Sequence, residues 1–202
     1  MKRIVVSCIL SIILILAMTG CKSENAVEEN LSSRMIEKDF SNLAFKISIP
    51  ENYFIAANTD TLVKIMPRSE EYSISVYKYY SPSDGGYPDF SDWPEEDRNM
   101  KLELYKGSTQ GYYSEYKCDF NAVETINVGD RMALHYYYDG QLSEEFINDV
   151  EYEGLPLSFT EDMYIFSDYG HIYVVIARIE NSEFTSDDVT LIKEIMNSIV
   201  IY

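Results

Sequence analysis

The strongest constraint on the fold of this 202-residue chain is a short segment, as long as a β-strand, whose side chains are apolar on both faces. The run Ile172-Tyr173-Val174-Val175-Ile176 has no charged or small polar side chain at either set of alternating positions. Successive side chains of a strand point to opposite faces, so this strand is expected at the centre of a sheet covered on both sides. With Met163–Ser167 it flanks Asp168-Tyr169-Gly170, which predicts a hairpin with a second strand over His171–Ile179.

Other segments alternate apolar and polar residues, as half-buried strands do. The stretch Phe45–Pro50 is one, and Met35–Phe40 is its expected hairpin partner. Further strands are predicted at Leu62–Met66, 72–77 and Arg131–Tyr138, and Asp139-Gly140 gives a hairpin-type turn signal after the last of them.

Two regions carry helix signals. Thr185 and Asp188 form a capping box, and the apolar stripe that follows packs on the sheet; it consists of Val189, Ile192, Ile195, Met196 and Ile199. An earlier helix is expected to be capped by Ser91 or Asp92 and to end at Gly107, with a second helical piece over Thr109–Phe120. This order predicts one α+β domain over residues 35–202, an antiparallel sheet with helices on its faces.

The segment Phe45–Pro50, the last hairpin and the closing Ile195–Ile199 stretch together resemble the PsbP-like fold, an α/β/α sandwich also seen in small bacterial lipoproteins. The likeness spans about Met35 to Tyr202 and lies in apolar positions. It implies an accessory or binding protein with no shared catalytic set. Because fold alone does not license a function, no catalytic residue, metal site or cofactor is carried over.

The N-terminus has the pattern of a secreted chain. Lys2 and Arg3 precede fifteen mostly apolar residues, which as a helix rise about 22 Å, short of the roughly 30 Å hydrocarbon core. Met18-Thr19-Gly20-Cys21 then resembles the lipobox of bacterial lipoproteins, although Leu is usual where Met18 stands. The resemblance implies a signal peptide over 1–20, lipidated Cys21 and a tether over 21–34. An uncut N-terminal helix or a plain secretory signal is the alternative.

Charge and cysteine content limit the function classes. The chain has a net charge of −18, and its surface repels nucleic acid and anionic lipid head groups. After removal of residues 1–20 and acylation of Cys21, Cys118 is the only remaining thiol, so no internal disulfide is expected. His135 and His171 are expected to be structural, because the chain has no Gly-x-Ser-x-Gly elbow and no paired Cys for zinc.

The remaining candidate sites are a tyrosine patch and an acidic loop. Tyr77 and Tyr79 share the more polar face of their strand, and with Trp93 in the nearby loop they form a candidate binding patch. The alternative is that tyrosine is abundant in this strand only because it has a high β-propensity. The loop Asp84–Asp97 is the basis of the alternative function, an acidic extracellular hydrolase or a calcium-dependent module.

These features predict a non-enzymatic, lipid-anchored protein of the extracytoplasmic face of a bacterial cell membrane. Cys21 supplies the membrane contact, because two acyl chains anchor stably where one is marginal. The expected partner is an envelope protein, an envelope polymer or a small ligand.

Replacing Cys21 by Ala should release the protein from membranes or leave an unprocessed precursor. Membrane fractionation, with the mass of the N-terminal peptide measured in the same sample, reads out both results. Cys118→Ala, which leaves the leader intact, is the control. A cleaved Cys21→Ala protein retained on the membrane would refute the anchor.

Overall fold

The computed structural model describes residues 34–81, 86–147 and 154–202, and the predicted leader, Cys21 and nearly all of the tether lie outside these ranges. Residues Met35–Tyr202 form one compact unit. No helix within the described ranges is long and apolar enough to cross a membrane. The elements are β1 (Met35–Phe40), β2 (Phe45–Pro50), β3 (Tyr53–Asn58), β4 (Leu62–Pro67), β5 (Tyr72–Tyr80), η2 (Phe90–Asp92), α2 (Glu95–Tyr112), β6 (Tyr116–Val128), β7 (Arg131–Leu142), β8 (Ser158–Asp168), β9 (His171–Glu180), α3 (Ser186–Asn197) and β10 (Val200–Ile201).

The main sheet has seven antiparallel strands in the order β3-β4-β5-β9-β8-β7-β6. The doubly apolar strand β9 is therefore the fourth of seven, which confirms its predicted central position. The predicted hairpin is also confirmed, because β8 and β9 pair from Asp168–His171 at the turn to Phe159–Glu180 at the open end. A second sheet of three strands has the order β1-β2-β10.

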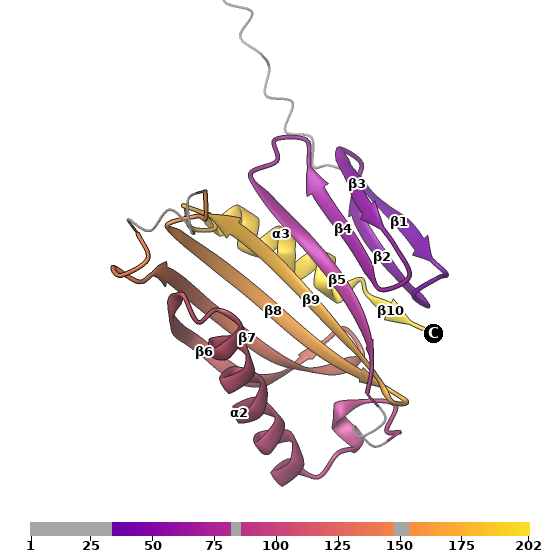
Figure 1. Ribbon diagram of the computed structural model, residues 1–202. Helices are drawn as coiled ribbons and strands as arrows, with labels where there is room; N and C mark the ends of the chain where they lie inside the picture. The colour runs from indigo at the N-terminus through magenta and orange to yellow at the C-terminus, as the bar shows by residue number, and fades with distance from the viewer. Residues whose placement is uncertain (1–33, 82–85, 148–153) are drawn as a thin grey trace, which may run out of the picture. The chain divides into compact units, whose positions relative to one another are not determined.

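One face of the main sheet is covered by α3 and the small sheet (Figure 1). The predicted capping box of α3 is present, with Thr185 Oγ1 accepting from the backbone N–H of Asp188. Ile192, Ile195 and Met196 of α3 are buried in the same core as Phe45 of the small sheet. The hydroxyl of Tyr173 on β9 donates to the carbonyl of Leu43, 2.7 Å away, which ties the central strand to the turn between β1 and β2.

The opposite face is covered only in part. The helix α2 packs over β6 and β7 and buries Leu102 against the main sheet, with Tyr136, Phe159 and Ile165 of that face in the same core (Figure 1). One helix is about 10–12 Å wide including its side chains, whereas strands lie about 4.8 Å apart, so α2 spans only two or three strands. The same face of β4, β5 and part of β9 consequently stays open.

The helix α2 differs from its prediction at both ends. It begins after Pro94, which has no side-chain cap, because the expected caps Ser91 and Asp92 form the short helix η2 instead. It also continues through Gly107 to Tyr112. Gly107 is exposed, so its lack of a side chain leaves no cavity in the core. The helical piece predicted at Thr109–Phe120 is therefore wrong from Tyr113 onward: Tyr116–Val128 is strand β6, and Phe120 on it packs 4.9 Å from the ring of Tyr138.

Two further differences concern strands. Asp139-Gly140 is not a turn but lies within β7, where Gly140 pairs with Phe159. A Cβ at Gly140 would lie 2.3 Å from the ring of Phe159, so the glycine makes room for an aromatic ring rather than for a reversal of the chain. The sequence pattern does not predict strand β3, because β3 is an edge strand with mostly exposed side chains and a bulge between Ile55 and Ala57.

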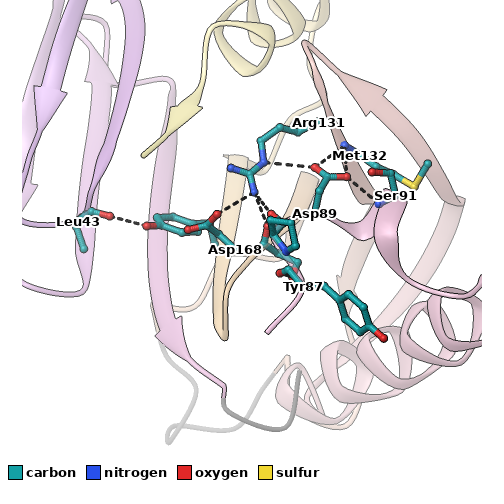
Figure 2. A network of polar contacts seen from close by, with 10 residues as sticks. Leu43, Tyr87, Asp89, Ser91, Arg131, Met132 and Asp168 are labelled. Carbon is teal, nitrogen blue, oxygen red and sulfur yellow. Dashed lines mark hydrogen bonds and ion pairs between the residues drawn. The ribbon is translucent and has the colours of Figure 1, made fainter. Parts of the chain in front are cut away.

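A polar network around Arg131 anchors the segment before α2 to the sheet (Figure 2). Nη2 of Arg131 donates to the carbonyl of Ser167 at 2.6 Å and to Oδ1 of Asp168 at 3.2 Å. Its Nε lies 3.4 Å from Oδ2 of Asp89, whose carboxylate also accepts from the backbone N–H groups of Ser91 and Met132. These contacts fix where the chain enters η2 and α2.

Replacing Ile195 by Asp should unfold the compact unit. Ile195 is fully buried, and an unpaired carboxylate there should cost about 4 kcal/mol or more. Thermal and urea unfolding followed by circular dichroism measure this, with Thr190→Asp, at an exposed neutral position of α3, as the control for one added negative charge. A soluble Ile195→Asp variant with the melting temperature of the wild type would contradict the packing of α3.

Candidate functional site

The uncovered part of the sheet and the side of α2 enclose a groove. Its polar end, of about 500 Å³, lies over β4, β5 and the end of β9; its aromatic end, of about 370 Å³, lies between α2 and strands β5, β8 and β9. The two ends share Tyr77, Tyr112, Tyr113, Glu161 and Ile176 and are therefore continuous. Both volumes fall within the roughly 300–1,000 Å³ typical of small-molecule sites.

Strand register accounts for the floor of the groove. Ser75 pairs with Ile176, and Tyr77 pairs with Val174, across β5 and β9. Because directly paired residues point to the same face, these four side chains form two adjacent rows under the open side of the sheet. The floor is therefore aliphatic beside α2 and becomes polar toward β4, where Lys64 pairs with Ser75.

Tyrosines form the wall of the aromatic end. Tyr77 and Tyr79 stack with ring centroids 6.0 Å apart and an interplanar angle of 11°, and Tyr79 is half exposed. Burial raises the pKa of the Tyr79 hydroxyl, and the neighbouring Tyr77 and Tyr112 raise it further. Tyr112, near the end of α2, is 79% exposed and lies edge-on to Tyr113. The strand and the helix therefore present their tyrosines to one groove.

Trp93 does not lie with these tyrosines. It is buried, and its ring packs against Phe90 at 5.3 Å and Tyr87 at 5.6 Å, in the core under the start of α2. The predicted grouping of Tyr77, Tyr79 and Trp93 is thus corrected: the structure brings Tyr77 and Tyr79 together with Tyr112 and Tyr105, and Trp93 lines neither end of the groove.

A buried carboxylate, Glu161, lies where the two ends of the groove meet. Tyr138, Glu161 and Arg178 are paired in one row across β7, β8 and β9. Oε1 of Glu161 accepts from the Tyr113 hydroxyl at 2.7 Å and from Nη1 of Arg178 at 3.0 Å, while Oε2 accepts from the Tyr138 hydroxyl. Burial, followed by the charge of Glu161, raises the pKa of Tyr138 well above the ordinary value, so its hydroxyl stays a donor.

Arg178 compensates the charge of Glu161. Its guanidinium lies 4.2 Å over the ring of Phe159 and 5.6 Å over that of Tyr113, and its Nε contacts Glu180 at 3.1 Å. Burial lowers the pKa of Arg178, but the charge and hydrogen bond of Glu161, together with Tyr113 and the charge of Glu180, outweigh this effect and raise the pKa, so the side chain remains a cation. Sequence reasoning missed this pair; the available signal was the period-two placement of Glu161 with Met163 and Ile165 on one face.

The acidic loop gives no cation site within the described residues. Asp84 lies outside the described ranges, and Asp89 already accepts from two backbone N–H groups and pairs with Arg131. No group of three or more His, Cys, Asp or Glu residues suited to a metal ion occurs in residues 34–81, 86–147 and 154–202. Glu161, the buried carboxylate of the groove, has three hydrogen-bond donors on its two oxygens.

The two histidines contact residues outside the Glu161 cluster, whereas the free cysteine Cys118 lies near enough to Glu161 that, after burial, the charge of Glu161 also raises the pKa of its thiol. His135 is buried, and its Nε2 lies 2.7 Å from Asp162 and its Nδ1 3.2 Å from Glu124, so both ring nitrogens are engaged by carboxylates. Its ring packs against Tyr164 at 4.7 Å, and that of His171 packs against Tyr80 at 5.6 Å. Cys118 is half-buried, and burial raises the pKa of its thiol to about 11, which disfavours the nucleophilic thiolate.

Comparison with solved structures places the fold. The solution structure of cyanobacterial PsbP (CyanoP) from Synechocystis sp. PCC 6803 is similar over 84% of this chain and 94% of its own, with 12% identity and a TM-score of 0.52. A point mutant of the protein Mog1 is similar over 83% of this chain and 96% of its own, with 10% identity and a TM-score of 0.51. No protein-family model and no curated protein matches the sequence. The expected PsbP-like fold is confirmed, and identities this low show the fold alone.

Replacing Arg178 by Met should destabilise the compact unit by about 3–5 kcal/mol, because it leaves the buried Glu161 without its cation. Urea unfolding measures the loss, and the exposed Arg68→Met is the control for removing an arginine. The double variant Arg178→Met with Glu161→Leu should recover part of the stability. Equal stability of Arg178→Met and the wild type would show that the pair is not energetically coupled.

Proposed function

We propose that this protein is a lipid-anchored binding or accessory module of the extracytoplasmic face of a bacterial membrane, without catalytic activity. Its partner or ligand, an envelope protein, polymer or small ligand, binds in the groove between α2 and β5. The observation that carries the proposal is this groove, into which a strand and a helix both direct tyrosines. Tyrosine supplies a large apolar contact area and a polar tip, and it is enriched where proteins bind partners.

The N-terminal sequence supports the location. The apolar run that ends at Thr19-Gly20-Cys21 has the length and the cysteine placement of a lipoprotein leader. The predicted tether is mostly polar between residues 22 and 33, and a flexible chain of that length would have a root-mean-square reach of roughly 20 Å. A domain held at that distance stays close enough to the membrane to meet envelope components.

The hydrolase and the calcium-dependent module gain no supporting observation. Glycoside hydrolysis needs two carboxyl groups facing each other across a cleft, about 5–9.5 Å apart. Four carboxylates line the polar end of the groove: Glu70, Glu71, Glu161 and Glu180. Glu161 is held by Tyr113, Tyr138 and Arg178, and Glu180 pairs with Arg178, so neither is presented free to a substrate, while Glu70 and Glu71 are exposed. The binding module is therefore the function that the described residues support best.

Replacing Tyr77 and Tyr79 together by Ala should weaken capture of the partner at least about tenfold while costing the fold little, because Tyr79 is half exposed. Crosslinking from intact cells, followed by quantitative mass spectrometry of the captured material, measures the effect. Urea unfolding of the same variant shows that the domain is intact.

Tyr80→Ala is the matched control for this experiment. Tyr80 is adjacent to Tyr79 on β5 and is 74% exposed, but its side chain points to the opposite face of the sheet. Tyr80→Ala should therefore capture the partner as the wild type does. Identical capture by the wild type and the Tyr77→Ala, Tyr79→Ala variant would overturn the role of the groove.

A further inference from the structure

The groove leaves two apolar side chains of the central strand β9 partly uncovered. Val174 and Ile176 are only partly buried, and they pack against the core that lies under α2. On the opposite face of the same strand, Tyr173, Val175 and Ala177 are at most 1% exposed. The groove side of β9 therefore lacks part of the cover that its other side has. A molecule that removed this apolar surface from water would be held there by the hydrophobic effect.

The aromatic end of the groove has the form of a slot over this surface. Tyr77 and Tyr79 stack on each other and form one wall on β5, while Tyr105 and Tyr112 of α2 form the other. Rings pack favourably against such walls, either offset or edge-on. The slot encloses about 370 Å³, which is the size of a small molecule. Its floor is made of apolar side chains: Met163, Ile165, Val174 and Ile176.

The aromatic end offers no uncompensated charge to a ligand. Among the described residues that line it, Glu161 alone is charged, and its two oxygens already accept from three donors of the protein. The exposed carboxylates Glu70 and Glu71 line only the polar end. A charged group in the slot would lose its hydration without gaining a partner, and this loss is much larger for an ion than for a neutral group. The slot therefore favours an uncharged ligand.

The floor also disfavours a ligand with many hydroxyl groups. The four side chains of the floor contain no oxygen or nitrogen atom, so sugar hydroxyls pressed against them would be desolvated without a hydrogen bond. The polar side-chain groups at the sides of the slot are mostly hydroxyls, those of Ser108, Thr109 and the tyrosines. They can meet a neutral polar group at the edge of a ligand, but they cannot satisfy a carbohydrate lying on the floor.

Resting on the proposed function of the groove, we infer that the aromatic end binds an uncharged, mainly apolar ring compound. The ring lies on Val174 and Ile176, between the tyrosine walls of β5 and α2, and supplies the cover that β9 lacks on this side. A neutral polar substituent of the ring lies toward the hydroxyls of Ser108 and Thr109.

Three probes with the same ring isolate the effect of charge: neutral 1-naphthalenemethanol, cationic 1-naphthylmethylammonium and anionic 1-naphthoate. The full-length protein, labelled with fluorotyrosine in lipid nanodiscs, is titrated by fluorine NMR, and free probe is measured by dialysis against empty nanodiscs. The neutral probe should bind saturably and one-to-one, and each ion at least about tenfold more weakly. Absence of binding of the neutral probe, or equally tight binding of either ion, would overturn the inference.

A variant of the floor locates the ring. Val174→Thr keeps the shape of the side chain but places a hydroxyl under the ligand, so it should weaken binding of 1-naphthalenemethanol about three- to tenfold. Val123→Thr is the matched control, because Val123 is also a partly buried strand residue but lines neither end of the groove. Urea unfolding shows that both variants are folded. Equal binding by Val174→Thr and the wild type would contradict a ring on this floor.

A carbohydrate probe separates this inference from the proposed function. Binding of chitotriose at the same tyrosine signals, with no binding of 1-naphthalenemethanol, would overturn the apolar ligand while leaving the groove a binding site. The proposed function itself fails only through unchanged partner capture by the Tyr77→Ala, Tyr79→Ala variant.

Discussion

The need to cover both faces of the central strand β9 governs this structure. Tyr173 and Val175 point to one face and Ile172 and Val174 to the other, so neither face of the sheet can be left to water along its whole length. The helix α3 and the small sheet cover the first face. The second face has only α2, which is too narrow for seven strands. The groove is the part of this face that α2 leaves uncovered, so its position is set by which strands α2 does not reach.

The charged row across β7, β8 and β9 shows how the sheet passes from its core to the open groove. A buried ion pair contributes little net stability, because desolvation of the two charges offsets their attraction. Glu161 is tolerated because Arg178 and two tyrosine hydroxyls satisfy both of its oxygens. The row thereby places a polar floor, whose charges satisfy one another, next to the aliphatic residues of the groove.

The proposed location and the proposed site fit one another physically. An anchored domain samples the same thin layer at the membrane surface, which raises the effective concentration of nearby envelope components. A groove with low affinity but high selectivity for its ligand is then sufficient for binding. The strongly acidic chain, of net charge −18, repels anionic lipid head groups.

Local sequence determined the features that depend on neighbours along the chain. Period-two alternation identified β2, β5 and the double-faced β9, and it placed Tyr77 and Tyr79 on one face; the pair Thr185 and Asp188 determined the start of α3. Tertiary structure alone decided which distant residues meet. Strand register brought Glu161 to Arg178, the ring of Phe159 made Gly140 a strand residue, and the packing of α2 brought Tyr112 to the groove and buried Trp93. Periodicity tells which way a side chain points, but the residue it faces is set by pairings between segments far apart in the chain.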